Sequence, residues 1–154
     1  MGFFQLKTNI ELRAEIDEVW EFISNPVNLK KITPDYMGFD ITSGDIPDKI
    51  YEGLIVSYIV APVFGIKTQW VTEITHVREK EYFVDEQRVG PYRMWHHQHF
   101  ISKTDKGTRM TDIVSYKPPF GYLGTVANSL LIRRKLNGIF EYRSIALADL
   151  FGII

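Results

Sequence analysis

Residues 92–116 read YRMWHHQHFISKTDKGTRMTDIVSY, and this stretch decides the fold that we expect. Polar and apolar residues alternate on both sides of the segment Thr104-Asp105-Lys106-Gly107, which has the Asp and Gly that tight turns favour. Alternation of this kind indicates strands with one buried face. The sequence therefore predicts a β-hairpin whose turn is centred on Asp105 and Lys106.

That turn sets the cross-strand register of the hairpin. Counting outward from it pairs four residues of one strand with four of the other: Ile101 with Met110, His99 with Asp112, His97 with Val114, and Trp95 with Tyr116. Side chains at every second position lie on the same side of a strand, so all eight are expected on one face. A face that mixes aromatic rings, imidazoles and a carboxylate is unusual for a core and suits the wall of a pocket.

The composition is that of an ordinary globular chain. Of the 154 residues, 45% are hydrophobic and 24% are charged, and we expect one domain that spans residues 1–154. The net charge of −1 leaves no excess of cations to neutralise phosphates, which argues against nucleic-acid binding. The absence of cysteine excludes disulfides, thiolate metal sites and cysteine nucleophiles.

Neither a signal peptide nor a transmembrane segment is predicted. The N-terminus lacks a basic stretch followed by an apolar run. No stretch reaches the roughly 20 apolar residues of a membrane span. We therefore expect a soluble, cytoplasmic protein.

The rest of the chain separates strands from helices. Residues 4–12 alternate as a strand, and two short helices follow before Pro34. Strand patterns fill most of residues 54–116, and a helical period runs from Gly121 to Phe151 with a bend expected at Gly138. This order predicts an α+β fold, a curved antiparallel sheet of about seven strands around a long C-terminal helix. One helix cannot fill the concave side of so large a sheet, so we expect an internal cavity.

Three motifs carry a family resemblance along nearly the whole chain. They are AEIDEVWEFI at residues 14–23 with Asn25-Pro26, FVDEQ at residues 83–87 with Gly90-Pro91, and TRMTDIVSY at residues 108–116 running into Pro119-Phe120-Gly121. The first resembles the start of the SRPBCC superfamily, which includes START lipid-transfer domains, plant pathogenesis-related pollen allergens and bacterial polyketide cyclases. The other two are similar to a bacterial ligand-binding branch of it.

The resemblance implies the helix-grip fold, with a deep apolar cavity beneath the C-terminal helix. None of the motifs matches a known catalytic set. The superfamily contains carriers, receptors for hydrophobic ligands and some enzymes, so the fold alone does not assign a function.

His97, His99 and Asp112 form the sharpest candidate site. Asp112 is suited to orient an imidazole that binds a ligand or acts as a general base. The alternative is a buried His–Asp pair that only sets the register of the sheet. A metal held by both imidazoles with Asp112 or Asp85 is a third alternative. No further feature marks a metal site, so we predict neither a metal nor a cofactor.

Further residues are expected along the cavity wall. Asp85 and Gln87 lie in phase with Phe83 and are expected either to enter the cavity or to bond an adjacent loop. Four aromatic residues are expected to line it for a flat or long ligand rather than serve only as core. The predicted ligand-binding set is therefore Tyr58, Trp70, Asp85, Gln87, Trp95, His97, His99, Asp112 and Tyr116.

Two surface features have alternative interpretations. Val63 and Phe64, between Pro62 and Gly65, are expected in a loop at the mouth of the cavity, where they would gate it or touch a membrane or partner; the alternative is that they are ordinary loop hydrophobes. The run Arg133-Arg134-Lys135 is interpreted as a solvated helix face, with docking of an anionic headgroup or a partner as the alternative.

The sequence leaves three functions open. The first is binding or carriage of a hydrophobic or aromatic small molecule, such as a lipid, quinone or polyketide. The second is a cyclase-, dehydratase- or hydrolase-like reaction with His97 or His99 as base and Asp112 as its orienter. The third is an interaction protein with a vestigial cavity. No paired nucleophile stands out, which favours binding. The ligand and the oligomeric state, a homodimer included, stay open.

Overall fold

The computed structural model describes residues 2–61 and 65–154. The predicted mouth-loop residues Val63 and Phe64 lie outside these ranges. Among the described residues, no helix combines the length and the apolar character that a membrane crossing requires.

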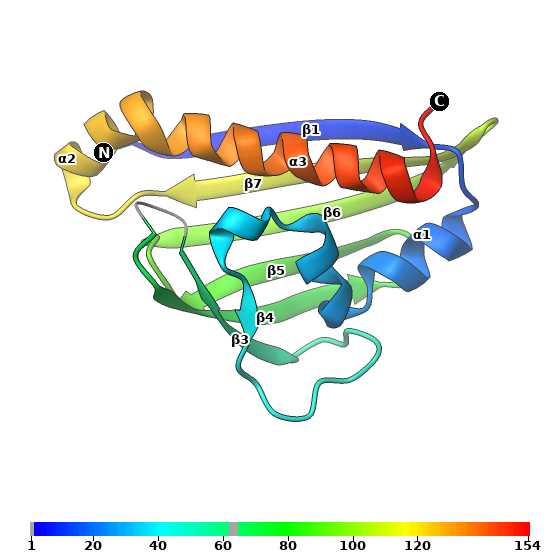
Figure 1. Ribbon diagram of the computed structural model, residues 1–154, viewed down its shortest axis with the longest axis horizontal. Helices are drawn as coiled ribbons and strands as arrows, with labels where there is room; N and C mark the ends of the chain where they lie inside the picture. The colour runs from blue at the N-terminus through cyan, green and yellow to red at the C-terminus, as the bar shows by residue number, and fades with distance from the viewer. Residues whose placement is uncertain (1, 62–64) are drawn as a thin grey trace.

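A seven-stranded antiparallel sheet forms the larger layer of the molecule (Figure 1). The sheet runs in the spatial order β1-β7-β6-β5-β4-β3-β2, so β1 pairs with the last strand and the other strands follow as consecutive neighbours. This arrangement confirms the predicted α+β class. The strands are β1 (Phe4–Leu12), β2 (Asp40–Ile41), β3 (Ile55–Val60), β4 (Thr68–Arg78), β5 (Tyr82–Val89), β6 (Met94–Thr104) and β7 (Gly107–Lys117).

The β6–β7 hairpin has the register that its turn predicts. β6 ends at Thr104 and β7 begins at Gly107, which leaves Asp105 and Lys106 as the loop. The four expected cross-strand pairs all form. All eight residues are at most 9% exposed, so they share the buried face of the sheet. The chemically mixed face predicted from the sequence is therefore the concave one.

The helices form two groups along the chain, one between β1 and β2 and one after β7. α1 (Ile16–Ile23) and the 3₁₀ helices η1 (Pro26–Ile32) and η2 (Asp35–Met37) follow β1. The C-terminal segment begins and ends as predicted and consists of α2 (Gly121–Ala127), the π-helical segment η3 (Asn128–Ile132) and α3 (Arg133–Phe151).

The irregularity of the C-terminal helix lies at η3, and the helix continues through Gly138, where a weak point or bend was expected. Gly138 lies inside α3, and a Cβ placed there would meet no atom within 4 Å. A glycine on an open helix face lowers helix propensity but leaves the backbone hydrogen bonds intact.

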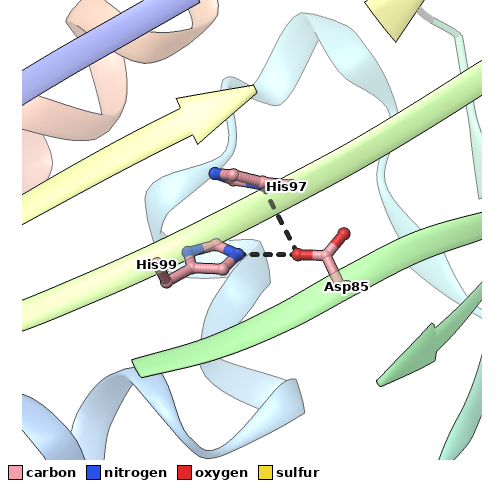
Figure 2. Close-up of side chains that lie close together, drawn as sticks. All are labelled: Asp85, His97 and His99. Atoms are coloured by element: carbon pink, nitrogen blue, oxygen red, sulfur yellow. Dashed lines mark hydrogen bonds and ion pairs between the residues drawn. The ribbon is translucent and has the colours of Figure 1, made fainter. Parts of the chain in front are cut away.

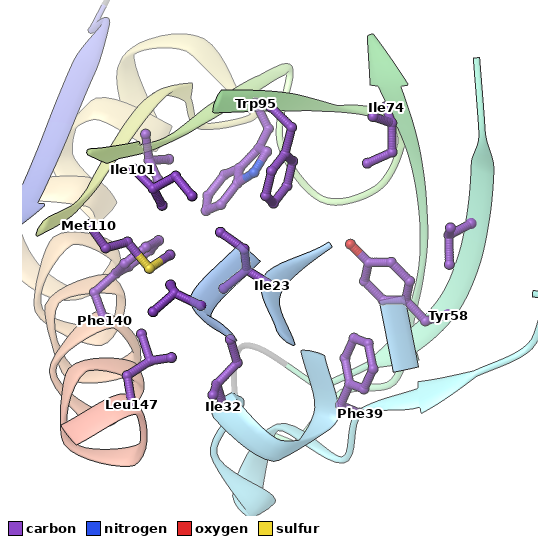
Figure 3. Packing of buried hydrophobic residues seen from close by; sticks show 14 of the residues in the cluster. Ile23, Ile32, Phe39, Tyr58, Ile74, Trp95, Ile101, Met110, Phe140 and Leu147 are labelled. Carbon is purple, nitrogen blue, oxygen red and sulfur yellow. The ribbon is translucent and has the colours of Figure 1, made fainter. Parts of the chain in front are cut away.

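The apolar core lies between the sheet and the helices (Figures 1 and 3). α3 contacts β1 and η1, whereas α1 contacts β6 and β7. Leu136, Phe140 and Leu147 recur on one side of α3, and all three are buried. Their spacing of four and seven residues gives α3 one face that packs toward the concave side of the sheet.

We expect Leu147→Ala to lower the free energy of unfolding by about 2–5 kcal/mol, because it removes a fully buried side chain and leaves a cavity. Leu147 is 1% exposed, whereas Ile145 on the same helix is 56% exposed. Ile145→Ala is therefore the control, with an expected change within about 0.5 kcal/mol. Urea unfolding measures both, and equal losses in the two variants would contradict this packing of α3.

Candidate functional site

A cavity of about 190 Å³ separates the concave face of the sheet from α3 and the helices after β1. This space is far larger than one buried water needs, so it can accept a small molecule. Asn28, Leu29 and Ile139 are half-buried and line its rim between η1 and α3. The wall is mainly apolar and includes Ile32, Phe39, Val56, Ile74, Leu136 and Phe140 (Figure 3).

Two imidazoles and two carboxylates form a closed ring at one side of this cavity. Asp85 Oδ2 lies 2.6 Å from His99 Nε2 and 3.4 Å from His97 Nδ1 (Figure 2). Asp112 Oδ1 lies 3.0 Å from His97 Nε2 and 2.9 Å from His99 Nδ1. Each imidazole therefore lies between the same two carboxylates, one from β5 and one from β7.

Arg143 of α3 completes the ring and ties the helix to the sheet. Its Nε donates a hydrogen bond to Asp112 Oδ2 at 3.2 Å. Its side chain is 7% exposed and that of Asp112 is 6% exposed, so this ion pair is buried. We name the five residues the charged ring: Asp85, His97, His99, Asp112 and Arg143.

The two carboxylates of the charged ring are ionised. Burial by itself raises the pKa of Asp112, but Arg143 and the two imidazoles outweigh burial and hold that pKa well below its ordinary value. Burial likewise raises the pKa of Asp85, and the opposing effects of His97, His99 and Arg143 leave it lowered. Together the carboxylates contribute two negative charges and Arg143 one positive charge, so a single further cation makes the ring neutral.

His99 supplies that cation. Burial lowers the pKa of His99, but hydrogen bonds to Asp112 and Asp85 outweigh burial and raise it. Both ring nitrogens of His99 face a carboxylate oxygen, which suits an imidazolium with two N–H donors. Arg143 Nη2 lies 3.2 Å from His99 Nδ1 and could donate there only to a neutral ring, a state that the charge balance disfavours.

His97 is the neutral member of the pair. Burial lowers its pKa, and the positive charge of His99 lowers it further, against the opposing effects of Asp85 and Asp112. The shorter of its two carboxylate contacts is the one to Asp112, so we place its hydrogen on Nε2. The ring centroids of the two histidines lie only 3.7 Å apart, with the rings tilted by 38°, which fits one charged and one neutral ring better than two charged ones.

A second polar cluster lies on β3 and β4. Thr72 Oγ1 lies 2.7 Å from the Tyr58 hydroxyl and accepts a hydrogen bond from Trp70 Nε1 at 3.1 Å. Burial, followed by the negative charge of Asp85, raises the pKa of Tyr58, so its hydroxyl keeps its proton. The hydroxyl points into the space between the layers (Figure 3).

Six of the nine predicted binding residues line the cavity: Tyr58, Trp70, Asp85, Trp95, His97 and His99. The other three lie outside the lining. Asp112 stands behind the imidazoles, and Tyr116 packs its ring against Tyr92 and Trp95.

Gln87 does not enter the cavity but bonds the adjacent loop, the second of the two alternatives expected from the sequence. Its amide nitrogen donates to Tyr92 O at 2.7 Å, and its amide oxygen accepts from Tyr92 N at 3.2 Å. The β5–β6 pairing stops at Glu86 and His96. Beyond it, the Gln87 side chain satisfies the backbone groups of Tyr92 in the connecting segment. Strand phase by itself does not reveal where pairing stops.

The sequence prediction missed Arg143. It lies three residues after Phe140 and four before Leu147, on the buried face of α3. A single cationic residue among the apolar residues of a buried helix face indicates a buried ion pair, because isolated charges are rarely buried. Tyr92 and Thr72 are further lining residues outside the predicted set.

Among the described residues, one group has a spacing that could hold a metal ion. It consists of Asp85, His97 and His99, whose ligand atoms all lie within 4.8 Å of one another. The charge balance does not favour a divalent ion there. Such an ion would displace the proton shared by His99 and Asp85 and leave a net positive charge beside buried Arg143. The residues therefore fit a proton better than a metal.

Solved structures share this architecture, although neither a protein-family model nor a curated protein matches the chain. Protein CV1439 from Chromobacterium violaceum has a TM-score of 0.71 at 13% identity, with 97% of this chain and 98% of that chain covered. Protein Ms6760 from Mycobacterium smegmatis has a TM-score of 0.65 at 18% identity, with 95% and 92% covered. Major latex-like protein 151 from Panax ginseng has a TM-score of 0.66 at 10% identity, with 97% of each covered.

These similarities extend over nearly the whole chain and confirm the resemblance at the level of the fold. The chain has the helix-grip fold, with a curved antiparallel sheet, short helices after the first strand and a long C-terminal helix.

The proton on His99 makes stability depend on pH with a defined sign. The pKa of His99 is raised in the folded state, so its stabilisation is complete below the unfolded value near 6.5 and is lost as pH rises through the folded value. We expect the stability advantage of the wild type over His99→Gln to shrink as the pH rises from about 6.5 through the raised folded-state pKa, by about 1.4 kcal/mol for each unit that separates the two pKa values.

Urea unfolding at several pH values measures this difference. His96→Gln is the control, because His96 lies on the other face of β6, where it contacts Glu86 at 2.7 Å outside the charged ring. An advantage over His99→Gln that stays constant or grows with pH would contradict the assignment of the proton.

Proposed function

We propose that the protein binds or carries a mainly apolar or aromatic small molecule, of lipid, quinone or polyketide type, in the cavity between the sheet and α3. The observation that carries this proposal is an apolar cavity with one ionised, partly accessible carboxylate in its wall. Apolar pockets with few polar groups are typical of small-molecule sites, in which the polar groups set the orientation of the ligand.

Asp85 is the group best placed to meet the ligand. Its side chain is 15% exposed, compared with 8% for His97 and 5% for His99. Its Oδ2 faces both imidazoles, and the second carboxylate oxygen points away from them (Figure 2). A carboxylate oxygen that points away from both imidazoles can accept a hydrogen bond, so the ligand should carry a hydroxyl or another hydrogen-bond donor at this end.

The aromatic rings support an extended or flat ligand body. Trp70 and Trp95 meet edge to face with centroids 5.1 Å apart, and Tyr58 stacks on Trp70. All three line the cavity. Large rigid rings offer contact area at small entropic cost, which suits recognition of an apolar molecule.

The occupancy of the imidazoles favours binding over the alternative His–Asp enzyme. All four ring nitrogens of His97 and His99 lie within 3.4 Å of a carboxylate oxygen. A general base needs a lone pair within reach of the substrate. Protonated His99 has none, and the one lone pair of His97, on Nδ1, faces Asp85 Oδ2 at 3.4 Å. Catalysis by His97 or His99 would require the ring to open first.

A cavity-blocking variant tests the proposal. Ile139→Trp places an indole at the rim, and we expect it to weaken binding of the fluorescent probe N-phenylnaphthylamine at least about tenfold. Ile145→Trp on the exposed side of α3 is the matched control and should bind as the wild type does. Fluorescence titration measures both. Equal affinities in the two variants would place the probe elsewhere and contradict the proposal.

The same titration, run as competition, tests the polar end of the ligand. Wild type should prefer naphthol to naphthalene, because only the hydroxyl can donate to Asp85. Asp85→Asn removes the negative charge, and the preference should fall roughly tenfold, as expected for a hydrogen bond to a charged group. An unchanged ratio of the naphthol and naphthalene affinities would show that Asp85 does not bind the hydroxyl of the ligand, even if the cavity binds both compounds.

A further inference from the structure

α2 and η3 present an apolar face to the solvent. Tyr122, Val126 and Leu130 are spaced four residues apart, and Leu123 lies beside them on the same side. Phe120 precedes the helix and is 81% exposed, and Leu123 and Leu130 are 73% and 76% exposed. We name these five residues the α2–η3 apolar face: Phe120, Tyr122, Leu123, Val126 and Leu130. A cluster of this kind on a helix is unusual unless it meets something.

The inner side of α2 explains why the apolar side cannot turn inward. A Cβ on buried Gly124 would lie 1.8 Å from Pro119 O, so α2 approaches the preceding segment more closely than any larger residue allows. Thr125 Oγ1 accepts a hydrogen bond from Gly2 N at 3.1 Å on the β1 side. The orientation of α2 is therefore fixed by close contacts, with its large apolar side chains outward.

The backbone at Phe120 is also unusual. Phe120 has φ of 62°, a left-handed conformation that is rare for a bulky residue. The side chain gains no burial in return, since it is among the most exposed large apolar side chains of the described residues. Strained residues that persist without a packing benefit are characteristic of functional surfaces.

The chain segment that carries this face is positively charged. Residues 113–140 contain Lys117, Arg133, Arg134 and Lys135 and no Asp or Glu, although the whole chain has a net charge of −1. Arg133 and Arg134 are exposed at the start of α3, directly after η3. An apolar helix face bordered by cations is the pattern of helices that lie in the interface of an anionic bilayer.

We propose that the α2–η3 apolar face, with Arg133 and Arg134, docks the protein onto membranes that contain anionic lipids. The apolar side chains enter the boundary between headgroups and acyl chains, and the guanidinium groups pair with lipid phosphates. The face lies at one end of the C-terminal helical segment, at the left in Figure 1, away from the free end of the chain at the C-terminus.

A second copy of the chain is a less suitable partner for this face. In a symmetric dimer the same patch meets itself, so Arg133 and Arg134 would face the same two residues of the other copy. Residues 113–140 offer no exposed carboxylate to neutralise them. A bilayer with anionic headgroups supplies the missing negative charge.

Co-sedimentation with vesicles tests the proposal. Wild type should pellet with phosphatidylcholine vesicles that contain about 30 mol% phosphatidylglycerol, and binding should fall in pure phosphatidylcholine and at high salt. The double variant Leu123→Ser/Leu130→Ser should bind the anionic vesicles at least about tenfold more weakly. Leu150→Ser, at an exposed apolar position near the other end of α3, is the control and should bind as the wild type does.

Arg133→Gln/Arg134→Gln tests the electrostatic part separately and should weaken binding to anionic vesicles roughly thirtyfold. Thermal unfolding of each variant checks that the exposed substitutions leave the fold intact. Three results would overturn the proposal: no pelleting of wild type with anionic vesicles, an equal loss in Leu150→Ser, or a wild-type dimer that Leu123→Ser/Leu130→Ser dissolves. Cavity binding of naphthol is scored separately, so failure of the docking surface and failure of the proposed function are distinguishable.

Discussion

The charged ring is the constraint on which the rest of the structure depends. It joins Asp85 of β5, His97 and His99 of β6, Asp112 of β7 and Arg143 of α3. Removing any one of the four charged members would leave a buried charge without a partner, which typically costs several kcal/mol. The ring therefore fixes the register of three neighbouring strands and the position of the long helix above them.

This constraint also shapes the cavity. Arg143 ties α3 to β7, and the concave surface of β3 and β4 faces the cavity, which η1 and η2 line from the other side. Apolar and aromatic side chains line most of the space, and the charged residues of its wall are Asp85, His99 and Arg143. The same contacts that stabilise the fold thus place one acceptor within an apolar cavity, which is the arrangement that an apolar molecule with a single donor would fit.

The sequence predicts those features that follow from local periodicity. The turn at Asp105 and Lys106 was enough to pair His99 with Asp112 and to place Trp95, His97 and Tyr116 on one buried face. Features that depend on contacts across elements were not predictable in this way. Gln87 leaves the cavity because β5 stops pairing with β6, and Arg143 enters because α3 turns that face inward. The π-helical segment after Ala127 likewise has no marker in the hydrophobic period.

The most direct test of this account is the protonation of the two buried histidines. A long-range proton–nitrogen NMR spectrum near pH 6.5 reports the charge and tautomer of each imidazole. The account predicts one imidazolium, at His99, and one neutral ring, at His97, with its hydrogen on Nε2. Two neutral rings, two charged rings, or a charge on His97 in place of His99 would contradict the charge balance on which the proposed site depends.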